Sequence, residues 1–274
     1  MENCTLGHYT SPIGLMGIIR GSLWATNIRY LNDDQEFKHA VDLIKEISST
    51  SLISKDHPDY GRKEEFVDAL QEKLESLQFV YPDYIFTASF SEKTDLLSQW
   101  RGYCPNNNGY CIEIDIGSLL KLIQTSFPQA RILKCLYDDK EKAKQIKDLL
   151  NKHWNKYKKS GQAAKKFVDS LTPELLTLAS HFKHSSFAEE AEHRIVVEVD
   201  GNDDPIKFRE GKYSIIPYIE LPIEKSSIKQ IIIGPTPRPA LANTGLTSFL
   251  EGEFKVPSFL LEVGISQSKT PYRA

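Results

Sequence analysis

The chain has 274 residues, with 34 Lys and Arg against 37 Asp and Glu, a formal net charge of -3, and 40% hydrophobic and 10% aromatic residues. This composition excludes intrinsic disorder and a surface that is basic throughout. The sequence contains no run of about 18 uncharged apolar residues, so we expect no membrane-spanning helix. The first residues lack the basic and apolar regions of a signal peptide, and we therefore expect a cytoplasmic protein without a membrane partner.

The first eighty residues predict three helices and one strand. Apolar residues at positions 66, 70, 74 and 77 recur at helical spacing, with Lys and Glu between them, which indicates an amphipathic surface helix. Pro12 and Gly21 are typical of the start and the end of a helix. The predicted elements are, in order, a helix over Ile13–Arg20, a strand over Ser22–Thr26, a helix over Phe37–Ile47 and a helix over Arg62–Gln78.

Short runs rich in β-branched and aromatic residues follow, and such runs predict strands. A polar and aromatic segment that ends at Gly109 separates the first two runs, and we expect it to form an irregular loop. The predicted elements are, in order, strands over Tyr84–Ser91 and Gly109–Asp115, a helix over Pro173–Lys183, and strands over Arg194–Val199, Tyr213–Tyr218, Ile228–Gly234 and Phe259–Ser266.

Lysine is concentrated in one part of the chain. Between residues 134 and 170, eleven Lys face five Asp or Glu, which leaves the rest of the chain acidic. We expect a basic helical insertion over residues 134–185, whose Lys-rich part contacts nucleic acid or, as the simpler interpretation, is a solvated face. Strands bracket the helices at both ends without regular βαβ alternation. The sequence therefore predicts a single α+β domain over residues 1–274, with a mixed or antiparallel β core and flanking helices.

Several enzyme classes lack their usual motifs here. The sequence has no G-x-x-x-x-G-K-[ST], G-x-G-x-x-G, G-x-S-x-G or H-E-x-x-H, which argues against P-loop NTPases, Rossmann dehydrogenases, α/β-hydrolases and zincins. The four cysteines are scattered, so we expect free thiols and no structural zinc. Asp83, followed by Glu92 and Lys93, leaves a metal-dependent nuclease as an alternative, although the acid-x-Lys pair typical of that chemistry is absent.

Polar and aromatic residues gather in four clusters. In the first, His8 precedes Tyr9 and Thr10 just before the first predicted helix, where a histidine is either structural or part of a site. In the second, Asn32 lies in a polar run that either caps the next helix or rims a pocket near Tyr30.

The third cluster combines a strand with the segment that follows it. Ser89 and Ser91 are two residues apart on a predicted strand, so both point to one face. Trp100 and Tyr103 offer flat stacking surfaces, and Arg101 offers donors for a phosphate or carboxylate. The alternative is a buried aromatic corner with an exposed arginine.

The fourth cluster leads into another predicted strand. Glu190, Glu192 and Arg194 share one face if this segment is extended. These charged side chains either form salt bridges at a solvated strand edge or include an acidic pair that stabilises a cationic transition state.

Taken in order, these clusters resemble the bacterial DUF2971 family of proteins of unknown function. The resemblance extends from residue 8 to residue 273, apart from the basic insertion, and implies no activity. The motifs that carry it are His8-Tyr9-Thr10, Leu23-Trp24-Ala25 with Asn32-Asp33 and Glu36, Ser89-Phe90-Ser91 with Gln99-Trp100 and Tyr103, Gly109-Tyr110-Cys111-Ile112-Glu113, Glu190-x-Glu192-x-Arg194, and Ser266 with Pro271-Tyr272-Arg273.

More distantly, the chain is similar to the ADP-ribosyltransferase superfamily, whose members carry a His or Arg on the first strand, a Ser-x-Ser on a later strand and a Glu-x-Glu at the start of another. The resemblance implies an ADP-ribosyltransferase-like fold. It also implies that His8 binds the NAD ribose, that Ser89 and Ser91 form the pocket strand, and that Glu192 is the catalytic acid. Glu189 and Glu190 compete for that last role.

The resulting hypothesis is an NAD-dependent ADP-ribosyltransferase or NAD glycohydrolase of a toxin or anti-phage defence system, with NAD as substrate and no metal. A non-catalytic module that senses a nucleotide or a phage product is the alternative from another class. The candidate catalytic residues are His8, Glu190 and Glu192, and the candidate NAD-binding residues are Tyr9, Thr10, Tyr30, Asn32, Ser89, Ser91, Trp100, Arg101 and Tyr103.

Overall fold

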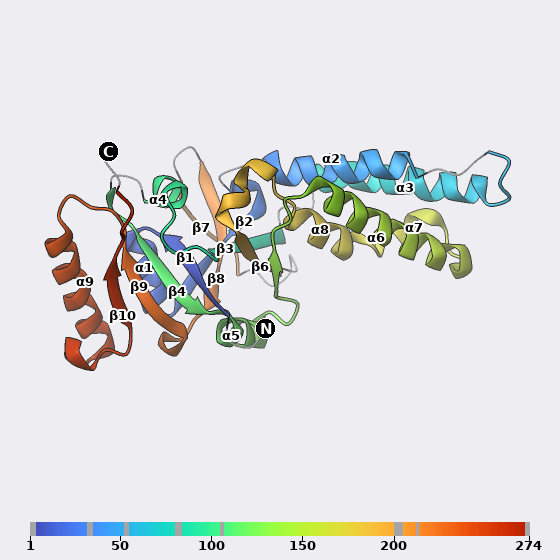
Figure 1. Cartoon of the computed structure of the whole chain (residues 1–274). Coiled ribbons are helices and arrows are strands. Elements are labelled where there is room, and N and C mark those ends of the chain that lie inside the picture. Colours follow the sequence, from blue (N-terminus) through green and yellow to red (C-terminus); the bar gives the residue numbers. More distant parts are fainter. Residues whose placement is uncertain are drawn as a thin grey trace.

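A computed structural model describes residues 4–31, 35–51, 55–79, 84–104, 107–199, 205–211 and 214–271 (Figure 1). These residues form a mixed α+β structure around a ten-stranded sheet, as the sequence predicts. The strands are β1 (Thr5–Thr10), β2 (Ser22–Asn27), β3 (Ile85–Ser91), β4 (Tyr110–Asp115), β5 (Arg131–Lys134), β6 (Glu192–Glu198), β7 (Lys207–Glu210), β8 (Ile215–Pro222), β9 (Ile228–Ile233) and β10 (Gly264–Gln267).

Helices cover both faces of this sheet. Short 3-10 helices in the described residues accompany them: η1 (Ile28–Tyr30), η4 (Ser185–Glu190), η5 (Lys225–Ser227) and η6 (Ser258–Leu260). The α-helices are α1 (Pro12–Ile19), α2 (Gln35–Ser49), α3 (Tyr60–Phe79), α4 (Leu97–Tyr103), α5 (Ile116–Ser126), α6 (Asp139–Ser160), α7 (Ala164–Asp169), α8 (Thr172–Ser180) and α9 (Pro239–Phe254).

The sheet forks at β3. On one edge, β3 pairs first with β2, through Phe86 and Thr87, and then with β1, through Ser91. From β1 the sheet continues to β4, β9 and β10, and from β2 it continues to β8 and β7. Every pairing is antiparallel except that of β9 with β10. The backbone between residues 87 and 91 of β3 thus faces an opening between two half-sheets.

The two faces of the sheet have different covers. Strand residues such as Leu23, Phe86 and Ile195 pack with α1, α5 and α9 in one buried cluster. On the opposite face, Val196 and Ile85 join a second cluster built by α2, α3, α6, α7 and α8. A third, smaller cluster on that same face holds α4 against β1, β4 and β9. The opposite face is therefore shared between α4 and a set of five helices.

These five helices form a lobe that extends away from the sheet (Figure 1). The predicted basic insertion, residues 134–185, contains α6, α7 and α8, while α2 and α3 come from a distant part of the chain. Phe66, Leu70 and Leu74 of α3 are almost fully buried in this lobe, which explains the strong helical period of that segment. We call α2, α3, α6, α7 and α8 the helical lobe.

Two sequence predictions need correction. The segment between β3 and β4 is not an irregular loop throughout, because it contains α4, which buries Gln99 and Trp100. The last predicted strand, Phe259–Ser266, begins too early: Ser258–Leu260 is a 3-10 helix with an exposed Phe259, and only Gly264–Gln267 pairs with β9. Aromatic composition there reflects a surface turn and not a strand.

The other predicted helices and strands that fall on described residues are present, with small shifts at their ends. The predicted strand Tyr213–Tyr218 starts outside the described residues. Its described part belongs to β8. In the described ranges, no helix combines the length and apolarity that crossing a membrane requires.

Candidate functional site

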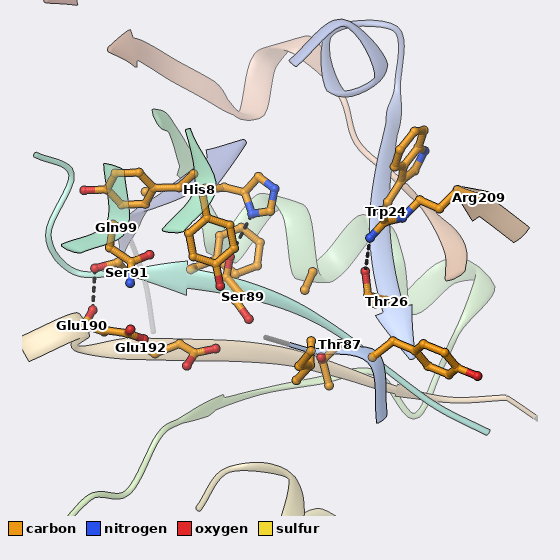
Figure 2. A pocket seen from close by; sticks show the side chains of 17 residues that line it. His8, Trp24, Thr26, Thr87, Ser89, Ser91, Gln99, Glu190, Glu192 and Arg209 are labelled. Atoms are coloured by element: carbon orange, nitrogen blue, oxygen red, sulfur yellow. Dashed lines mark hydrogen bonds between the residues drawn. The ribbon is translucent and has the colours of Figure 1, made fainter. Parts of the chain in front are cut away.

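A cavity of about 140 Å³ lies where the sheet forks, and we call it the fork pocket (Figure 2). Its walls come from β1, β2 and β3, from α4, and from the turn that leads into β6. Side chains on β3 alternate between faces, so Thr87, Ser89 and Ser91 point to the face that α4 and the helical lobe share, while Phe86, Ala88 and Phe90 lie in the core of the other face. The side of β3 that lines the fork pocket is thus polar, whereas the other side is apolar.

His8 lies in the opening between the half-sheets. Its Nδ1 is 2.8 Å from the carbonyl oxygen of Ser89, and its ring packs 5.5 Å from that of Phe90. A carbonyl oxygen only accepts, so Nδ1 carries the proton. Burial lowers the pKa of His8 despite the opposing hydrogen bond to Ser89, which keeps the imidazole neutral at pH 7. The other ring nitrogen, Nε2, is then an acceptor and has no hydrogen-bond partner among the described residues.

Ser89 and Ser91 have different roles. Both serines lie on β3 and pair with β6. The cross-strand partner of Ser89 is Arg194, and that of Ser91 is Glu192. The Ser91 hydroxyl donates to the carbonyl oxygen of Glu190 at 2.6 Å and accepts from the amide of Lys93. Ser91 therefore fastens the turn that carries Glu190, whereas Ser89 supplies the carbonyl that orients His8.

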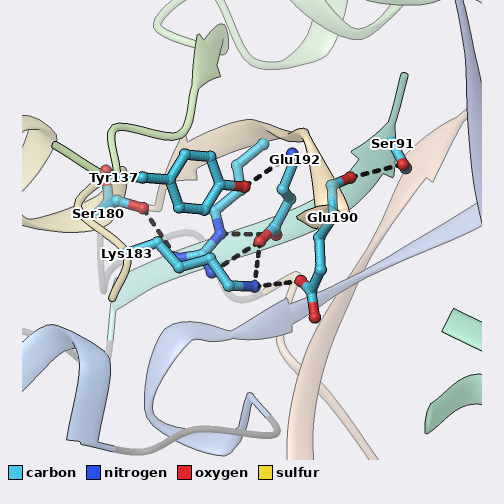
Figure 3. A network of polar contacts seen from close by, with 7 residues as sticks. Ser91, Tyr137, Ser180, Lys183, Glu190 and Glu192 are labelled. Carbon is cyan, nitrogen blue, oxygen red and sulfur yellow. Dashed lines mark hydrogen bonds and ion pairs between the residues drawn. The ribbon is translucent and has the colours of Figure 1, made fainter. Parts of the chain in front are cut away.

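Glu192 is the centre of a buried ion cluster (Figure 3). Its two carboxylate oxygens accept from Nε and a terminal nitrogen of Arg194 at 2.8 and 3.1 Å, and from Nζ of Lys183 at 2.6 Å. Its backbone amide donates to the Tyr137 hydroxyl, and Arg194 also donates to the Ser180 carbonyl. Burial raises the pKa of Glu192, but the charges of Arg194 and Lys183 outweigh it and lower the pKa to about 2.

Glu190 differs from Glu192 in its contacts. One of its carboxylate oxygens accepts from Nζ of Lys183 at 2.6 Å, and the other has no partner in the described part of the chain. Ala191, between the two acids, has a left-handed backbone with φ of 44°, which turns the two side chains in different directions. Of the two carboxylates that line the fork pocket, that of Glu190 retains more capacity to meet a ligand.

A second cavity of about 280 Å³ adjoins the fork pocket, and we call it the second chamber. The two cavities share Ser89, Gln99, Tyr103, Glu190 and Glu192 among their lining residues. Burial, reinforced by the nearby Glu192 carboxylate, raises the pKa of Tyr103 to about 12, so its hydroxyl keeps its proton. The two cavities together can hold a ligand with two connected parts.

Each cavity contains a buried hydroxyl without a partner. The Oγ1 atom of Thr87, in the fork pocket, and the Oγ atom of Ser98, in the second chamber, form no hydrogen bond with the described residues. A buried hydroxyl left unpaired costs about 1–3 kcal/mol.

The sequence analysis did not identify Arg209 as a residue of the fork pocket. Arg209, on β7, donates to the hydroxyl of Thr26 at 3.2 Å and lies 5.8 Å over the Trp24 ring. Its Nε is buried and has no partner among the described residues. No local motif marks this arginine, because only the pairing of β7 with β8 and of β8 with β2 brings it to the pocket.

The predicted site residues do not all line a cavity. The fork pocket brings together His8, Tyr9, Tyr30, Ser89, Ser91, Tyr103, Glu190 and Glu192. Trp100 is instead fully buried under Tyr9, with its indole nitrogen donating to Asp95 at 2.7 Å. Arg101 is exposed on α4, and Thr10 ends β1, and neither lines the two cavities. Asn32 lies outside the described residues.

Tyr9 lines the fork pocket, yet its hydroxyl is committed elsewhere. It donates to the Lys93 carbonyl and accepts from the Leu96 amide, each at 2.9 Å. Tyr9 therefore holds the segment before α4 in place. Across the described ranges, no three or more His, Cys, Asp or Glu side chains are grouped so that they could hold a metal ion. Asp83, on which the nuclease alternative rests, lies outside the described residues.

Fold and site together define an α+β protein with a two-part polar cavity at the fork of its sheet. The family model described as "Protein of unknown function (DUF2971)" matches residues 99–195, which confirms the predicted resemblance over that stretch. The matched stretch includes α4, the helices of the insertion and the Glu190–Arg194 cluster, and leaves His8 outside it. No curated protein and no solved structure matches the chain. The similarity to ADP-ribosyltransferases stays a prediction.

Proposed function

We propose that the fork pocket and the second chamber bind NAD and that the protein breaks the bond between nicotinamide and ribose. The observation that carries this proposal is the meeting of His8, Ser89 and Glu190, from three distant segments, around one cavity (Figure 2). The proposal requires this convergence, because no single segment carries all the groups that the reaction needs.

The chemistry asks for few groups. When the glycosidic bond breaks, nicotinamide leaves as a neutral molecule with the bonding electron pair, and the ribose carbon becomes oxocarbenium-like. A carboxylate nearby stabilises this positive charge, which is largest in the transition state. Water, or another nucleophile in ADP-ribosyl transfer, then bonds to that carbon and loses its proton. No metal takes part in this scheme.

Glu190 is the carboxylate that we assign to this role. Glu192 is already engaged by Arg194 and Lys183 through both oxygens, so its charge is largely spent within the protein. Glu190 has one pair with Lys183 and an oxygen without a described partner. It also lines both cavities, as Glu192 does, and would therefore lie between the two parts of a dinucleotide that occupied them.

The remaining groups would hold the substrate. Neutral His8 can accept a hydrogen bond from a ribose hydroxyl through Nε2. Trp24, Tyr30 and Tyr103 provide aromatic surface for the nicotinamide ring. Arg209 lines the fork pocket, and a guanidinium group suits a phosphate oxygen.

The test is nicotinamide release from NAD, followed by mass spectrometry. We expect release by the wild-type protein and a loss of at least about 100-fold for Glu190→Gln, the size typical of removing one group that stabilises transition-state charge. Glu189→Gln is the matched control, because Glu189 is the adjacent acid, is exposed and lines neither cavity. His8→Phe should lower release as well.

Two results would contradict the proposal. One is full release by Glu190→Gln, and the other is binding of NAD by the wild-type protein without any turnover. The second result would favour the non-catalytic sensing module. An active protein of the toxin or defence type should also lower cellular NAD and stop the growth of a bacterial host, and Glu190→Gln should do neither.

A further inference from the structure

One face of α6 carries a row of lysines and asparagines. From Lys140 to Lys158, successive members of this row are four, three, four, four and three residues apart, so they lie on one side of the helix. They are exposed except for Lys158, which is half-buried. We call this set the α6 stripe: Lys140, Lys144, Lys147, Asn151, Asn155 and Lys158.

The lysines of the helical lobe fall into two groups. Some pair with acids, as Lys152 does with Glu174, and Lys165 with Glu72, each at 2.8 Å. Lys45, Lys73 and Lys142 are paired in the same way. By contrast, the four lysines of the α6 stripe form no ion pair with any described residue. Their charges are therefore available to an external anion.

The charge of the lobe as a whole does not explain the stripe. The Lys-rich stretch of residues 134–170 packs against α2 and α3, and residues 35–79 contain ten acids and six basic residues. These acids offset much of the basic excess. The three acids of α6 are Asp139, Glu141 and Asp148, and none of them belongs to the stripe. Four of the eight lysines of α6 thus lie on the stripe, and the exposed Lys156 and Lys159 add positive charge beside it.

We propose that the α6 stripe binds the phosphate backbone of double-stranded nucleic acid. The stripe covers 18 residue steps and so extends about 27 Å, which approaches one turn of a duplex. Lysine and asparagine are side chains that donate to phosphate and sugar oxygens without reading sequence. A duplex carries about one negative charge every 1.7 Å, so a line of four cations meets several phosphates.

The aromatic residues of α6 favour a duplex over a single strand. Single-strand sites stack successive bases on exposed aromatic side chains. Trp154 and Tyr157, the two aromatic residues of α6, are instead buried in the lobe, where they pack with Phe66. The α6 stripe has no aromatic member. It therefore offers backbone contacts only, which a regular duplex satisfies along its length.

Binding is measured with a labelled 30-base-pair DNA duplex and no NAD, so the outcome is independent of the proposed NAD cleavage. The test variant carries four substitutions to Gln, at Lys140, Lys144, Lys147 and Lys158. Wild-type affinity should fall steeply with salt, and the variant should bind at least about tenfold more weakly. Its plot of log affinity against log salt should be flatter by about 3–4, since each phosphate contact contributes about 0.9.

The matched control removes the same charge elsewhere. Lys45, Lys152, Lys165 and Lys207 are paired with acids, and their joint replacement by Gln should leave duplex binding within about threefold of wild type. Asp148→Asn, which removes the acid that follows Lys147 in sequence, should strengthen binding. Thermal melting of each variant separates loss of binding from loss of fold.

Four results would overturn the proposal: no duplex binding by the wild-type protein at 50 mM salt, equal binding by the stripe variant, equal loss in the control variant, or preference for a single-stranded 30-mer RNA. Binding to phosphatidylserine vesicles without duplex binding would contradict it as well, because the stripe would then fit an anionic membrane surface.

Discussion

The fork pocket and the α6 stripe place charge in opposite ways. At the fork, Glu192, Arg194 and Lys183 are buried and satisfy one another. In the α6 stripe, the four lysines are separate, largely exposed and without acidic partners among the described residues. A charge in the first region depends on its neighbours, so each change there alters both stability and geometry. A charge in the second region acts nearly alone, so its effect is electrostatic and additive.

The strongest test of this difference is Arg194→Met. The change leaves the buried Glu192 with Lys183 as its remaining cation, and breaking a buried pair costs about 3–5 kcal/mol. Arg20→Met is the control, because the Arg20–Glu253 pair is at the surface and contributes at most about 1 kcal/mol. Urea unfolding measures both. Equal losses would show that burial does not set the cost of removing a charge.

A smaller effect should appear as a pH dependence. Because the pKa of Glu192 is lowered to about 2 from an ordinary value of 4.5, its ionised form stabilises the fold above pH 4.5. That contribution, on the order of 3 kcal/mol, is lost as the pH falls from 4.5 towards 2. The free energy of unfolding should therefore drop less steeply over this range in Glu192→Gln than in the wild type. Parallel curves would mean that Glu192 is not held ionised.

The smallest effect compares a glycine beside the fork with a glycine of the helical lobe. In Gly7→Ala, the new Cβ would lie 2.7 Å from Cys111 Sγ and 2.8 Å from Thr94 Cγ2, so we expect a loss of about 1–3 kcal/mol from overpacking beside His8. Gly61→Ala, on α3 of the lobe, meets no atom within 4 Å and should gain about 0.5–1 kcal/mol. Thermal unfolding distinguishes the two, and a stable Gly7→Ala protein would contradict the close packing at the fork.

Local patterns predicted much of the fold. The period of α3, the Ser-x-Ser strand and the helical character of the Lys-rich segment were all predicted, because each depends on neighbours a few residues apart. Helix α5 was missed because it follows β4 directly, with Asp115 as both the last strand residue and the helix cap. Helix α4 was missed because its seven residues are too few to show a clear period.

The candidate site shows the same limit. The motifs identified His8, Ser89 and the two glutamates, but not that Lys183 neutralises much of the Glu192 charge or that Arg209 reaches the pocket. Both facts depend on pairings between segments far apart in the chain. Trp100 was predicted to stack on a ligand, although it is fully buried, because aromatic residues serve core and site alike.

The fork has a mechanical consequence. Through their hydrogen bonds, the half-sheets that start at β1 and β2 are joined by β3, which offers one residue to β1 and two to β2. A ligand bound between the half-sheets would contact both β1 and β2, and would hold them together where backbone hydrogen bonds do not. Its binding energy would add to the stability of the folded chain. It would also slow amide exchange in both half-sheets at once, including strands that it never touches.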